Sequence, residues 1–430
     1  MTEKEKMKIL IVGCGGSEHA LTWKLSRSPR VNKVFIAPGN AGTATIGENI
    51  SITSAEDILS WLKINRVDLV LIGSASYLAE GLTDQIDRLG IPVFGPTKVA
   101  AQIEWSKSFA KNFMLTEGIP TAAFEIFSDI ERAKQYVKDQ NFPLVIKSDG
   151  LAFGLGTIIV KNLKEAELAL YELMVRKMFG SAGKTVVIEE FLEGREISVH
   201  AFCDGDNALL FPASRDYKRL LDGDKGPNTG GMGSIAPVPW VTPDIMDEIK
   251  EEIVLPTLRG LKKIGRPFVG VLFPGVIVTS NGPMALELNA RFGDPETQSY
   301  MRILKTNLVD ILLACINGDL KNYPIEWSDK FACCVITAAE GYPGKYKKGI
   351  AIDGLAAFDI NSDVVIFQAG TKIRGSDTVV NSRGRALGIS AVGNNLNSAI
   401  NKTYGALEKI KFDGMQFRTD IGKEALILYR

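Results

Sequence analysis

The sequence predicts a multidomain protein of the α/β and α+β classes. Its 430 residues exceed the size of one ordinary hydrophobic core and indicate two to four domains. Near the N-terminus, short apolar runs alternate with helical stretches, a pattern typical of a doubly wound parallel sheet. Near the C-terminus, apolar runs separated by turns precede one long helical stretch, which predicts a small α+β domain.

The composition indicates a globular protein whose charge attracts neither nucleic acid nor a membrane surface. Hydrophobic residues make up 45% of the chain and charged residues 23%, and 50 basic residues balance 50 acidic ones. No apolar run approaches the roughly 18 residues of a membrane span, and the N-terminus lacks the apolar region of a signal peptide. We therefore expect small-molecule substrates and no nucleic-acid or membrane partner.

The cysteines and histidines give no sign of a zinc site or of histidine catalysis. The cysteines are odd in number and lack the paired spacings of zinc ligands, so we interpret them as buried free thiols in the cytoplasm. They are Cys14, Cys203, Cys315, Cys333 and Cys334. The two histidines, His19 and His200, are expected to pack or to form hydrogen bonds near helix ends.

The N-terminal sheet is predicted from apolar runs at residues 8–12, 33–37, 68–73 and 91–94. The first run breaks at Gly13-Cys14-Gly15-Gly16 before a helical stretch, which places backbone N–H groups where an anion can bind. One glycine turn is weak evidence, and it is not the complete dinucleotide-binding fingerprint. Residues 38–42 and 73–75 follow other strand ends, where ligands of such sheets gather.

A helix predicted over residues 99–117 follows this sheet and carries Lys107. The next strand, at residues 122–127, precedes a helix that the capping pair Ser128 and Glu131 is expected to open. These elements begin a second unit with mixed strands.

Lys147 lies in the apolar strand at residues 143–148, where an unpaired ammonium group would be costly. We therefore expect Lys147 to meet an anion. The glycine-rich stretch 149–156 follows and is supple enough to close over phosphates. A stretch of this kind is more often a plain turn when it stands alone.

The apolar run at residues 186–192 ends in paired carboxylates, and Glu196 follows six residues after Glu190. Backbone groups near Phe191 and Leu192 are placed to bond the edge of an adenine, with Glu196 accepting from ribose hydroxyls. Residues 226–233 are too glycine-rich for regular structure, so their backbone can approach a ligand closely. A helix is then predicted over residues 243–264.

A hairpin at residues 270–289 carries the strongest candidate for a metal site. Its strands, 270–279 and 283–289, flank Asn281-Gly282, a dipeptide suited to a tight turn. Because side chains alternate along a strand, Glu287 and Asn289 share one face. A carboxylate and an amide oxygen suit Mg²⁺, although an ordinary surface strand is an equally good interpretation of these residues alone. Arg291 and Asp294 follow as a fixed cation and a fixed anion, ahead of a helix predicted over residues 297–317.

The last part of the chain is predicted to form strands at residues 333–338, 364–368 and 386–392, followed by a helix at 395–410. We expect domain boundaries at 1–100, 101–325 and 326–430, with residues 121–192 forming a smaller lid within the second domain.

Ten motifs in order resemble the phosphoribosylamine–glycine ligase family of purine biosynthesis. They are GCGGSEHA, PGNAGT, FGPT, SKSFAKNFM, VIKSDGLAFGLG, VIEEFLEGREIS, GPNTGGMG, ELNARFGDPETQ, EGYPGKYKKG and RTDIG. The resemblance covers nearly the whole chain. It implies an ATP-grasp fold that the doubly wound domain precedes and the α+β domain follows. It also implies a two-step reaction, in which ATP phosphorylates the glycine carboxylate and the amine of 5-phosphoribosylamine then displaces the phosphate.

The resemblance also implies roles for individual residues. ATP would contact Lys107, Lys147, Gly154, Gly156, Glu189, Glu190, Phe191, Leu192, Glu196, Asn228, Gly230 and Gly231. Glu287 and Asn289 would hold Mg²⁺ or Mn²⁺, while Arg291 and Asp294 would bind the two ends of glycine, with Asp216 and Lys218 beside them as catalytic residues. The phosphoribosylamine would contact Gly13, Gly15, Gly16, Ser17, Glu18, Asn40, Gly42, Thr43 and Gly73.

Several positions depart from the motifs of the family. Ser17 stands where the family has arginine and Ala75 where it has glutamate, both in the region expected to bind the amine. Leu155 lies in the phosphate loop, and the other departures are Tyr217, Gln368 and Arg383.

These departures leave three interpretations of the function. The first is the glycine ligase itself, as a monomer or homodimer. The second is a diverged ligase that joins an amino acid to a different amine. The third is a nucleotide-binding protein without turnover.

Overall fold

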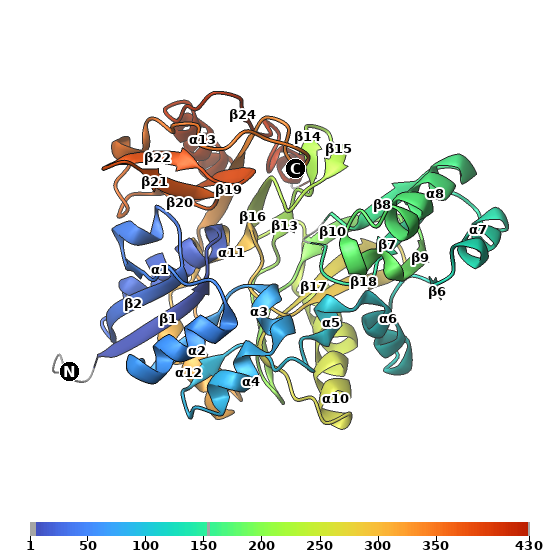
Figure 1. Cartoon of the computed structure of the whole chain (residues 1–430), viewed down its shortest axis with the longest axis horizontal. Coiled ribbons are helices and arrows are strands. Elements are labelled where there is room, and N and C mark those ends of the chain that lie inside the picture. The colour runs from blue at the N-terminus through green and yellow to red at the C-terminus, as the bar shows by residue number, and fades with distance from the viewer. Residues whose placement is uncertain (1–5, 153–154, 429–430) are drawn as a thin grey trace.

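The computed structural model describes residues 6–152 and 155–428. The N-terminal sheet, the central sheet and the C-terminal sheet lie together, and a smaller lid projects away from them on the right of Figure 1. Within the described ranges, no helix is both long enough and apolar enough to cross a membrane.

The N-terminal sheet is parallel throughout and has the strand order β3-β2-β1-β4-β5. This order confirms the predicted doubly wound sheet. Its strands are β1 (Met7–Gly13), β2 (Val31–Pro38), β3 (Glu48–Asn49), β4 (Leu69–Ile72) and β5 (Val93–Phe94). The surrounding helices are α1 (Gly16–Ser26), the short 3₁₀ turn Thr43–Thr45, α2 (Ala55–Ile64), α3 (Ala75–Glu80) and α4 (Leu82–Asp87). Most residues of β1 and β4 are buried, because both faces of the sheet are covered.

The single helix predicted over residues 99–117 is wrong, because the chain forms α5 (Gln102–Trp105) and α6 (Lys107–Thr116) instead. Ser106 between them has extended backbone angles, and its hydroxyl accepts a hydrogen bond from the N–H of Phe109 at 3.3 Å. Asp149 accepts a second one from the N–H of Ser108 at 3.0 Å. These side-chain caps replace the backbone hydrogen bonds of a continuous helix and place Lys107 at the first position of α6.

The lid, defined here as the elements from β6 to β9, has an antiparallel sheet in the order β6-β9-β7-β8. Its strands are β6 (Phe124–Phe127), β7 (Leu144–Ser148), β8 (Thr157–Val160) and β9 (Val186–Glu190). Its helical segments are α7 (Ile130–Lys138), α8 (Leu163–Leu170), a π-helical turn (Tyr171–Val175) and a 3₁₀ turn (Gly180–Lys184). The lid has a small apolar core of its own, which includes Ile146, Leu170 and Ile188.

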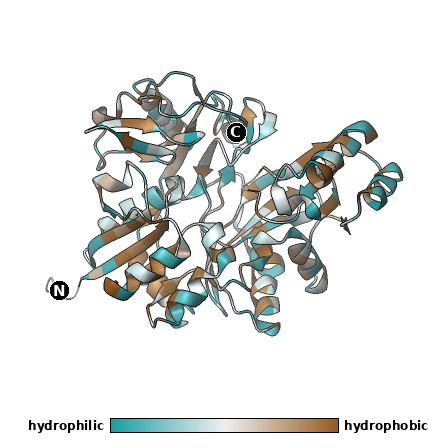
Figure 2. Ribbon diagram, viewed as in Figure 1, coloured by the Kyte–Doolittle hydropathy of each residue, from teal (hydrophilic) through white to brown (hydrophobic). Residues whose placement is uncertain are grey.

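The predicted capping pair of α7 is wrong by one position. Asp129, not Ser128, is the N-cap, and its carboxylate accepts a hydrogen bond from the N–H of Arg132 at 2.9 Å. The hydroxyl of Ser128 instead lies 2.9 Å from that of Thr185. Figure 2 shows that α7 presents a largely hydrophilic surface, which agrees with the burial of only Ala133 and Val137 along it.

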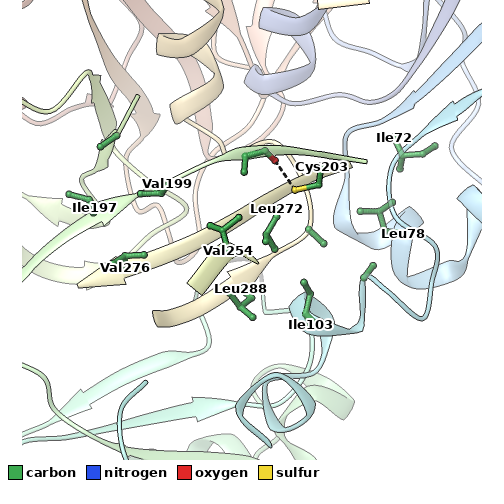
Figure 3. Packing of buried hydrophobic residues seen from close by; sticks show 14 of the residues in the cluster. Ile72, Leu78, Ile103, Ile197, Val199, Cys203, Val254, Leu272, Val276 and Leu288 are labelled. Atoms are coloured by element: carbon green, nitrogen blue, oxygen red, sulfur yellow. Dashed lines mark hydrogen bonds between the residues drawn. The ribbon is translucent and has the colours of Figure 1, made fainter. Parts of the chain in front are cut away.

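The central sheet has the order β10-β17-β11-β12, with β18 also paired to β17. Its strands are β10 (Arg195–Ser198), β11 (Ala201–Asp204), β12 (Ala208–Leu210), β17 (Val269–Thr279) and β18 (Gly282–Asn289). Figure 3 shows Leu272, Val276 and Leu288 of this hairpin packed with neighbouring apolar residues, among them Val254. The tight turn between β17 and β18 consists of Ser280 and Asn281, one residue earlier than predicted, because Gly282 already pairs with Thr279.

The helix predicted over residues 243–264 is continuous but contains a π-helical turn. It consists of α9 (Pro243–Ile249), the π turn Lys250–Val254 and α10 (Leu255–Lys263). The helix predicted over residues 297–317 is wrong, since α11 (Glu296–Ile303) and α12 (Leu308–Asn317) are separate. Asn307 caps α12 by accepting from the N–H of Val309 at 3.2 Å, and Leu304 bridges to Trp327.

The C-terminal sheet has the order β13-β16-β19-β23-β20, and β24 also pairs with β19. Its strands are β13 (Arg215–Asp216), β16 (Gly233–Ala236), β19 (Phe331–Ala339), β20 (Val364–Gln368), β23 (Arg385–Gly393) and β24 (Met415–Gln416). The strands predicted in this region are confirmed, as is the helix, α13 (Leu396–Leu407), with Asn395 as its N-cap. The sequence did not indicate that β13 and β16, from the middle of the chain, would join this sheet.

Two hairpins and two short helical segments complete the fold. The hairpins are β14 (Arg219–Leu221) with β15 (Lys225–Asn228) and β21 (Thr371–Arg374) with β22 (Thr378–Asn381). The helical segments are a 3₁₀ turn (Leu355–Ala357) and α14 (Lys423–Leu428).

Candidate active site

The two candidate metal ligands lie near the end of β18. A bulge opposite Gly275 and Val276 interrupts the pairing of β17 with β18, and Glu287 lies directly after it. Burial alone would raise the pKa of Glu287, but the ammonium groups of Lys218, Lys147 and Lys107 lower it to about 2. The carboxylate is therefore ionised at neutral pH.

Asn289 complements this carboxylate. Its amide nitrogen donates to the carbonyl of Phe273 at 3.2 Å, which leaves the amide oxygen available as a ligand. One carboxylate and one amide oxygen fit a Mg²⁺ ion, which keeps several waters and also binds phosphate oxygens. The described residues contain no group of three or more His, Cys, Asp or Glu side chains that could hold a metal, so substrate phosphates would have to complete the ion's coordination.

Lys218 is held beside the metal ligands by two carboxylates. Its ammonium group lies 3.5 Å from Glu287 and 3.6 Å from Glu196. Burial opposes the charged form, but Glu287 and Glu196 together raise the pKa of Lys218. Glu196 therefore lies near the candidate metal ligand Glu287, with Lys218 between them, whereas the sequence predicts a contact with the ribose of the nucleotide.

Lys147 meets the anion predicted for it. Its ammonium group lies 2.9 Å from Glu189 and donates to the carbonyl of Leu286 at 2.9 Å. Lys111 also lies 2.9 Å from Glu189, and burial lowers the pKa of Lys111 to about 8. Sequence reasoning missed Lys111, although it lies one helical turn after Lys107 in the SKSFAKNFM motif.

Glu189 and its neighbours also suit a nucleotide base. Within the described part of the chain, the second carboxylate oxygen of Glu189 is buried without a hydrogen-bond partner. An amino group of a base would satisfy this acceptor. Glu190 instead turns toward the start of the lid, where it accepts from the N–H of Ala123 at 2.8 Å. Phe191 and Leu192 follow in the connection between lid and central sheet, and Phe191 is exposed.

The glycine-rich loop lies beside Lys107. The Lys107 ammonium group donates to the carbonyl of Gly150 at 3.2 Å. Gly156 has no room for a side chain, because a Cβ there would meet the Ser148 hydroxyl. Asn228 contacts the next strand by donating to the carbonyl of Thr157 at 3.1 Å. Gly154, also predicted to contact ATP, lies outside the described residues.

A second cluster forms where the predicted amine-binding residues meet. Glu18 accepts from the N–H of Gly15 at 2.6 Å and lies against Gly13 and Gly73, where any Cβ would meet its side chain. Burial, and then the nearby Asp294, raise the pKa of Glu18.

Asn40 fixes the same cluster through both ends of its amide. Its nitrogen donates to the carbonyls of Cys14, Gly15 and Gln368 at 3.1, 3.2 and 2.9 Å. Its oxygen accepts from the N–H groups of Gly42 and Thr43 at 2.9 and 3.1 Å. The β1–α1 turn, the turn after β2 and the end of β20 therefore meet, as the prediction of one amine site requires.

Gly16 and Ser17 complete this cluster. A Cβ at Gly16 would meet the amide of Gln298, so α1 packs closely against α11 here. Ser17 is buried, with 5% of its surface exposed. Gly16 therefore lies at the contact between the β1–α1 turn and the segment that follows the candidate metal ligands, and Ser17 is the next residue of α1.

Arg291 and Asp294 lie between the two clusters. Arg291 pairs with Glu104 at 2.9 Å, and Glu104 also accepts from the N–H of Ala290 at 2.8 Å. Asp294 lies 3.4 Å from the guanidinium of Arg385. A Cβ at Gly15 would come within 3.2 Å of Asp294, so Asp294 reaches the amine end.

Arg385 also holds the glycine motif. Its guanidinium donates to the carbonyls of Gly230, Gly231 and Asp294, the last two at 3.2 and 3.1 Å. Sequence reasoning missed both Arg385 and Glu104, because neither lies in a motif that was assigned a role.

Asp216 and Glu296 form a buried acidic pair. Burial, and then the neighbouring Glu296, raise the pKa of Asp216. Burial likewise raises the pKa of Glu296, which accepts from the hydroxyl of Ser198 at 2.8 Å. Burial and the like charge of Glu296 act in the same direction on Asp216 and disfavour its ionised form. Glu296 was not predicted as a site residue.

Both histidines are structural, as expected. The Nδ1 atom of His19 accepts from the N–H of Gln368 at 2.8 Å, and the Nε2 atom of His200 accepts from the N–H of Gly293 at 3.1 Å. Burial lowers the pKa of His19 to about 4 and that of His200 well below its usual value. Both imidazoles are therefore neutral at physiological pH.

Family models match three consecutive parts of the chain. They are described as the N domain, the ATP-grasp (A) domain and the C domain of phosphoribosylglycinamide synthetase, at residues 7–104, 105–297 and 332–424. The fold and the site therefore define an ATP-grasp ligase, a class of enzyme that uses ATP together with Mg²⁺.

Proteins of similar sequence fall within one family of that class. Phosphoribosylamine–glycine ligases from Caldanaerobacter subterraneus and Neisseria meningitidis are 44% and 45% identical, over 96% and 98% of this chain and 99% and 100% of theirs. A bifunctional purine biosynthetic protein of Dictyostelium discoideum is 43% identical over 98% of this chain, which spans 55% of that relative. The chain belongs to the phosphoribosylamine–glycine ligase family.

Solved structures agree with this assignment. The phosphoribosylamine–glycine ligase of Thermotoga maritima has a TM-score of 0.85 and 35% identity, over 96% of this chain and 100% of its own. The biotin carboxylase domain of Hydrogenobacter thermophilus 2-oxoglutarate carboxylase, in complex with MgADP, has a TM-score of 0.73 over 99% of each chain. It is 16% identical, so that likeness shows the fold alone.

Proposed function

We propose that the chain joins glycine to 5-phosphoribosylamine in an ATP-dependent reaction that proceeds through glycyl phosphate and releases ADP and phosphate. One observation carries the proposal. The ammonium groups of Lys107, Lys147 and Lys218 act together on the carboxylate of Glu287, which lies beside the amide of Asn289. Preformed positive charge around a metal carboxylate is the arrangement that phosphoryl transfer requires.

The nucleotide is bound between the lid and the central sheet. Lys107 and Lys147 contact its phosphates, Glu189 contacts the base, and Glu196 contacts the ribose. Glu287 and Asn289 hold Mg²⁺ or Mn²⁺, and the bound ion neutralises charge on the phosphates during transfer. Lys218 is suited to the same developing charge because Glu287 and Glu196 keep it protonated.

Glycine is bound between the two clusters. Arg291 pairs with its carboxylate and Asp294 with its ammonium group, while Gly231 allows Asp216 and Pro295 to approach the backbone closely, since a Cβ there would meet both. The raised pKa values of Asp216 and Glu296 allow one of these carboxyl groups to hold a proton.

The amine is bound by the cluster around Glu18, Asn40 and Thr43. The N–H groups of the β1–α1 turn and of α1 face an anionic group such as a sugar phosphate. Asp294 reaches this cluster, so the activated glycine and the amine would meet beside it. The reaction then depends mainly on positioning, and it requires no histidine base.

We also propose that the protein acts in the cytoplasm as a monomer or homodimer. Four of its five cysteines are buried, and all five are free thiols, which suits a reducing compartment. Size-exclusion chromatography coupled to light scattering would distinguish a monomer from a homodimer.

The proposed reaction is tested by measuring ADP release with Mg·ATP, glycine and freshly generated phosphoribosylamine. The expected result is turnover that requires both glycine and the amine. Release that requires glycine but not this amine would contradict the assignment of the second substrate. ATP binding without any ADP formation would support the third interpretation, a protein without turnover.

The first prediction concerns the metal ligand. Glu287→Ala should lower Mg·ATP-dependent ADP release by at least about a hundredfold, because a carboxylate ligand of the metal is lost. A matched control is Glu251→Ala, which removes an exposed carboxylate from the helix that contains α9 and α10. Unchanged ADP release by Glu287→Ala would contradict the assignment of Glu287 as a metal ligand.

A second candidate function is a ligase for a different amine. It is favoured by one observation, namely that Ser17 and Ala75 are nearly buried, at 5% and 9% exposed, and bring no charge to the amine end. Ser17→Arg combined with Ala75→Glu should then raise activity with phosphoribosylamine.

One charged group opposes this second candidate. The positive charge of Arg383 partly offsets the burial that raises the pKa of the Cys14 thiol, so its guanidinium lies near Cys14. Arg383 therefore brings a cation to the amine end that can substitute for the arginine missing at position 17. If it does, Arg383→Gly should lower activity with phosphoribosylamine. If the site binds a different amine, activity with phosphoribosylamine should be low in the unmodified chain and should not change in the variant.

A further inference from the structure

Lys111 forms a buried cluster with Lys147 and Glu189, and the proposed reaction gives Lys111 no role. Its ammonium group and that of Lys147 both lie 2.9 Å from the same oxygen of Glu189. The exposed fractions of the three side chains are 2%, 7% and 2%. Two cations therefore share one carboxylate, and the cluster carries a net positive charge.

The cluster also joins several elements of the candidate site by hydrogen bonds. Lys111 donates to the hydroxyl of Thr121 at 2.7 Å, and this hydroxyl donates to the carbonyl of Ala285 at 2.6 Å. Lys147 donates to the neighbouring carbonyl of Leu286. Helix α6, the connection into the lid, two strands of the lid and the metal-bearing strand β18 are thus tied together by one set of hydrogen bonds.

We propose that Lys111 is a positioning residue, which holds the carboxylate of Glu189 so that Lys147 keeps its place and its charge for the nucleotide phosphates. This proposal rests on the proposed binding of ATP by Lys147, and it assigns Lys111 no contact with the nucleotide.

Glu189 and the nucleotide phosphates compete for the positive charge of Lys147. A carboxylate that faces only Lys147 neutralises that ammonium group, and the resulting neutral pair attracts phosphate weakly. A second ammonium group on the same oxygen compensates the carboxylate and leaves one positive charge available. Lys111 contacts this oxygen and also donates to the hydroxyl of Thr121, so it supplies that compensation while Lys147 also donates to the carbonyl of Leu286.

The test is direct binding of Mg·ADP by calorimetry, together with steady-state kinetics in ATP and in glycine. Lys111→Met keeps the length of the side chain and removes its charge. We expect it to weaken Mg·ADP binding and to raise KM for ATP by about tenfold to a hundredfold, the range of one charge-assisted hydrogen bond. The effect on kcat and on KM for glycine should be much smaller. Lys134→Met is the control, since it removes an exposed ammonium group elsewhere on the lid.

Two further variants separate positioning from a general loss of packing. Lys111→Arg retains the charge and should bind Mg·ADP more tightly than Lys111→Met does. In Lys111→Met combined with Glu189→Gln the competing carboxylate is gone, so Mg·ADP binding should recover in part. If Lys111 had only a structural role, the double variant would bind Mg·ADP more weakly than Lys111→Met or Glu189→Gln alone.

The proposal is overturned if Lys111→Met binds Mg·ADP as tightly as Lys134→Met, or if the double variant binds no better than Lys111→Met. Failure of the proposed ligation is distinguishable, because Mg·ADP binding is measured without any amine. An unmodified chain that binds Mg·ADP but does not consume phosphoribosylamine would leave the role of Lys111 intact.

Discussion

Buried imidazoles make the stability of this molecule depend on pH. His19 is 3% exposed and its pKa lies at about 4, against about 6.5 in an unfolded chain. Between these two values the unfolded chain binds a proton that the folded chain does not. Stability therefore rises with pH from 4 to 6.5, and it is lost progressively as the pH falls through this window.

His19→Asn tests this dependence, because asparagine keeps an acceptor near the position of Nδ1. Relative to the variant, the unmodified chain should lose about 3 kcal/mol of unfolding free energy between pH 6.5 and pH 4. Urea unfolding at several pH values measures the difference, in which the contribution of His200 cancels. Parallel stability curves for the two chains would contradict the prediction.

Individual site residues were predictable where their chemistry stands out along the chain. Lys147 in an apolar strand was expected to meet an anion, and it does so at Glu189. Glu287 and Asn289 stay a predicted metal pair, proposed because two oxygen ligands share one face of a strand. Lys111 and Arg385 could not be predicted, since each acts through partners more than 70 residues away in the sequence. The resemblance supplied the remaining roles.

At the level of elements, capping side chains decide where helices begin. Asp129 caps α7 by accepting from the N–H of Arg132, whereas Ser128 contacts Thr185. Asp129→Ala should therefore destabilise the lid by about 0.5–2 kcal/mol, and Ser128→Ala should have a smaller effect. Hydrogen exchange at the first turn of α7 measures the difference. Equal exchange in the two variants would count against Asp129 as the cap.

The element predictions failed where local hydrogen bonds compete with helical periodicity. Apolar spacing predicted one helix over residues 99–117, but Ser106 and Asp149 bond to backbone N–H groups and restart the helix at Lys107. Periodicity shows which face of a segment is apolar. It contains no signal from Asp149, which caps Ser108 from 41 residues further along the sequence.

At the level of the whole molecule, Arg418 fastens the C-terminus to the middle of the chain. It is 1% exposed and pairs with Asp224 at 2.6 Å and with Asp420 at 2.7 Å. Asp224 follows β14 in the hairpin that leads to the glycine motif, and Tyr217 adds a hydrogen bond from the N–H of Gly422 at 3.0 Å. Tyr217, a departure from the family motif, therefore has a structural role.

Arg418→Ala should destabilise this attachment by about 3 kcal/mol, the low end for breaking a buried ion pair, because both carboxylates retain contact with water. We expect a lower thermal midpoint and faster tryptic cleavage after Lys225 in the hairpin. Arg176→Ala is the control, since its partner Glu172 forms an exposed pair worth about 0.5 kcal/mol or less. Cleavage at the same rate in both variants would contradict the role of Arg418.

During synthesis, two neighbouring strands of the C-terminal sheet leave the ribosome at different times. Strand β16 ends at Ala236, and its partner β19 begins at Phe331, about 95 residues later. At typical rates of synthesis, β19 is made roughly 5 to 20 s after β16. During this interval an apolar strand edge is open to pairing with other nascent chains. Slower translation through this stretch should therefore increase the demand for chaperones.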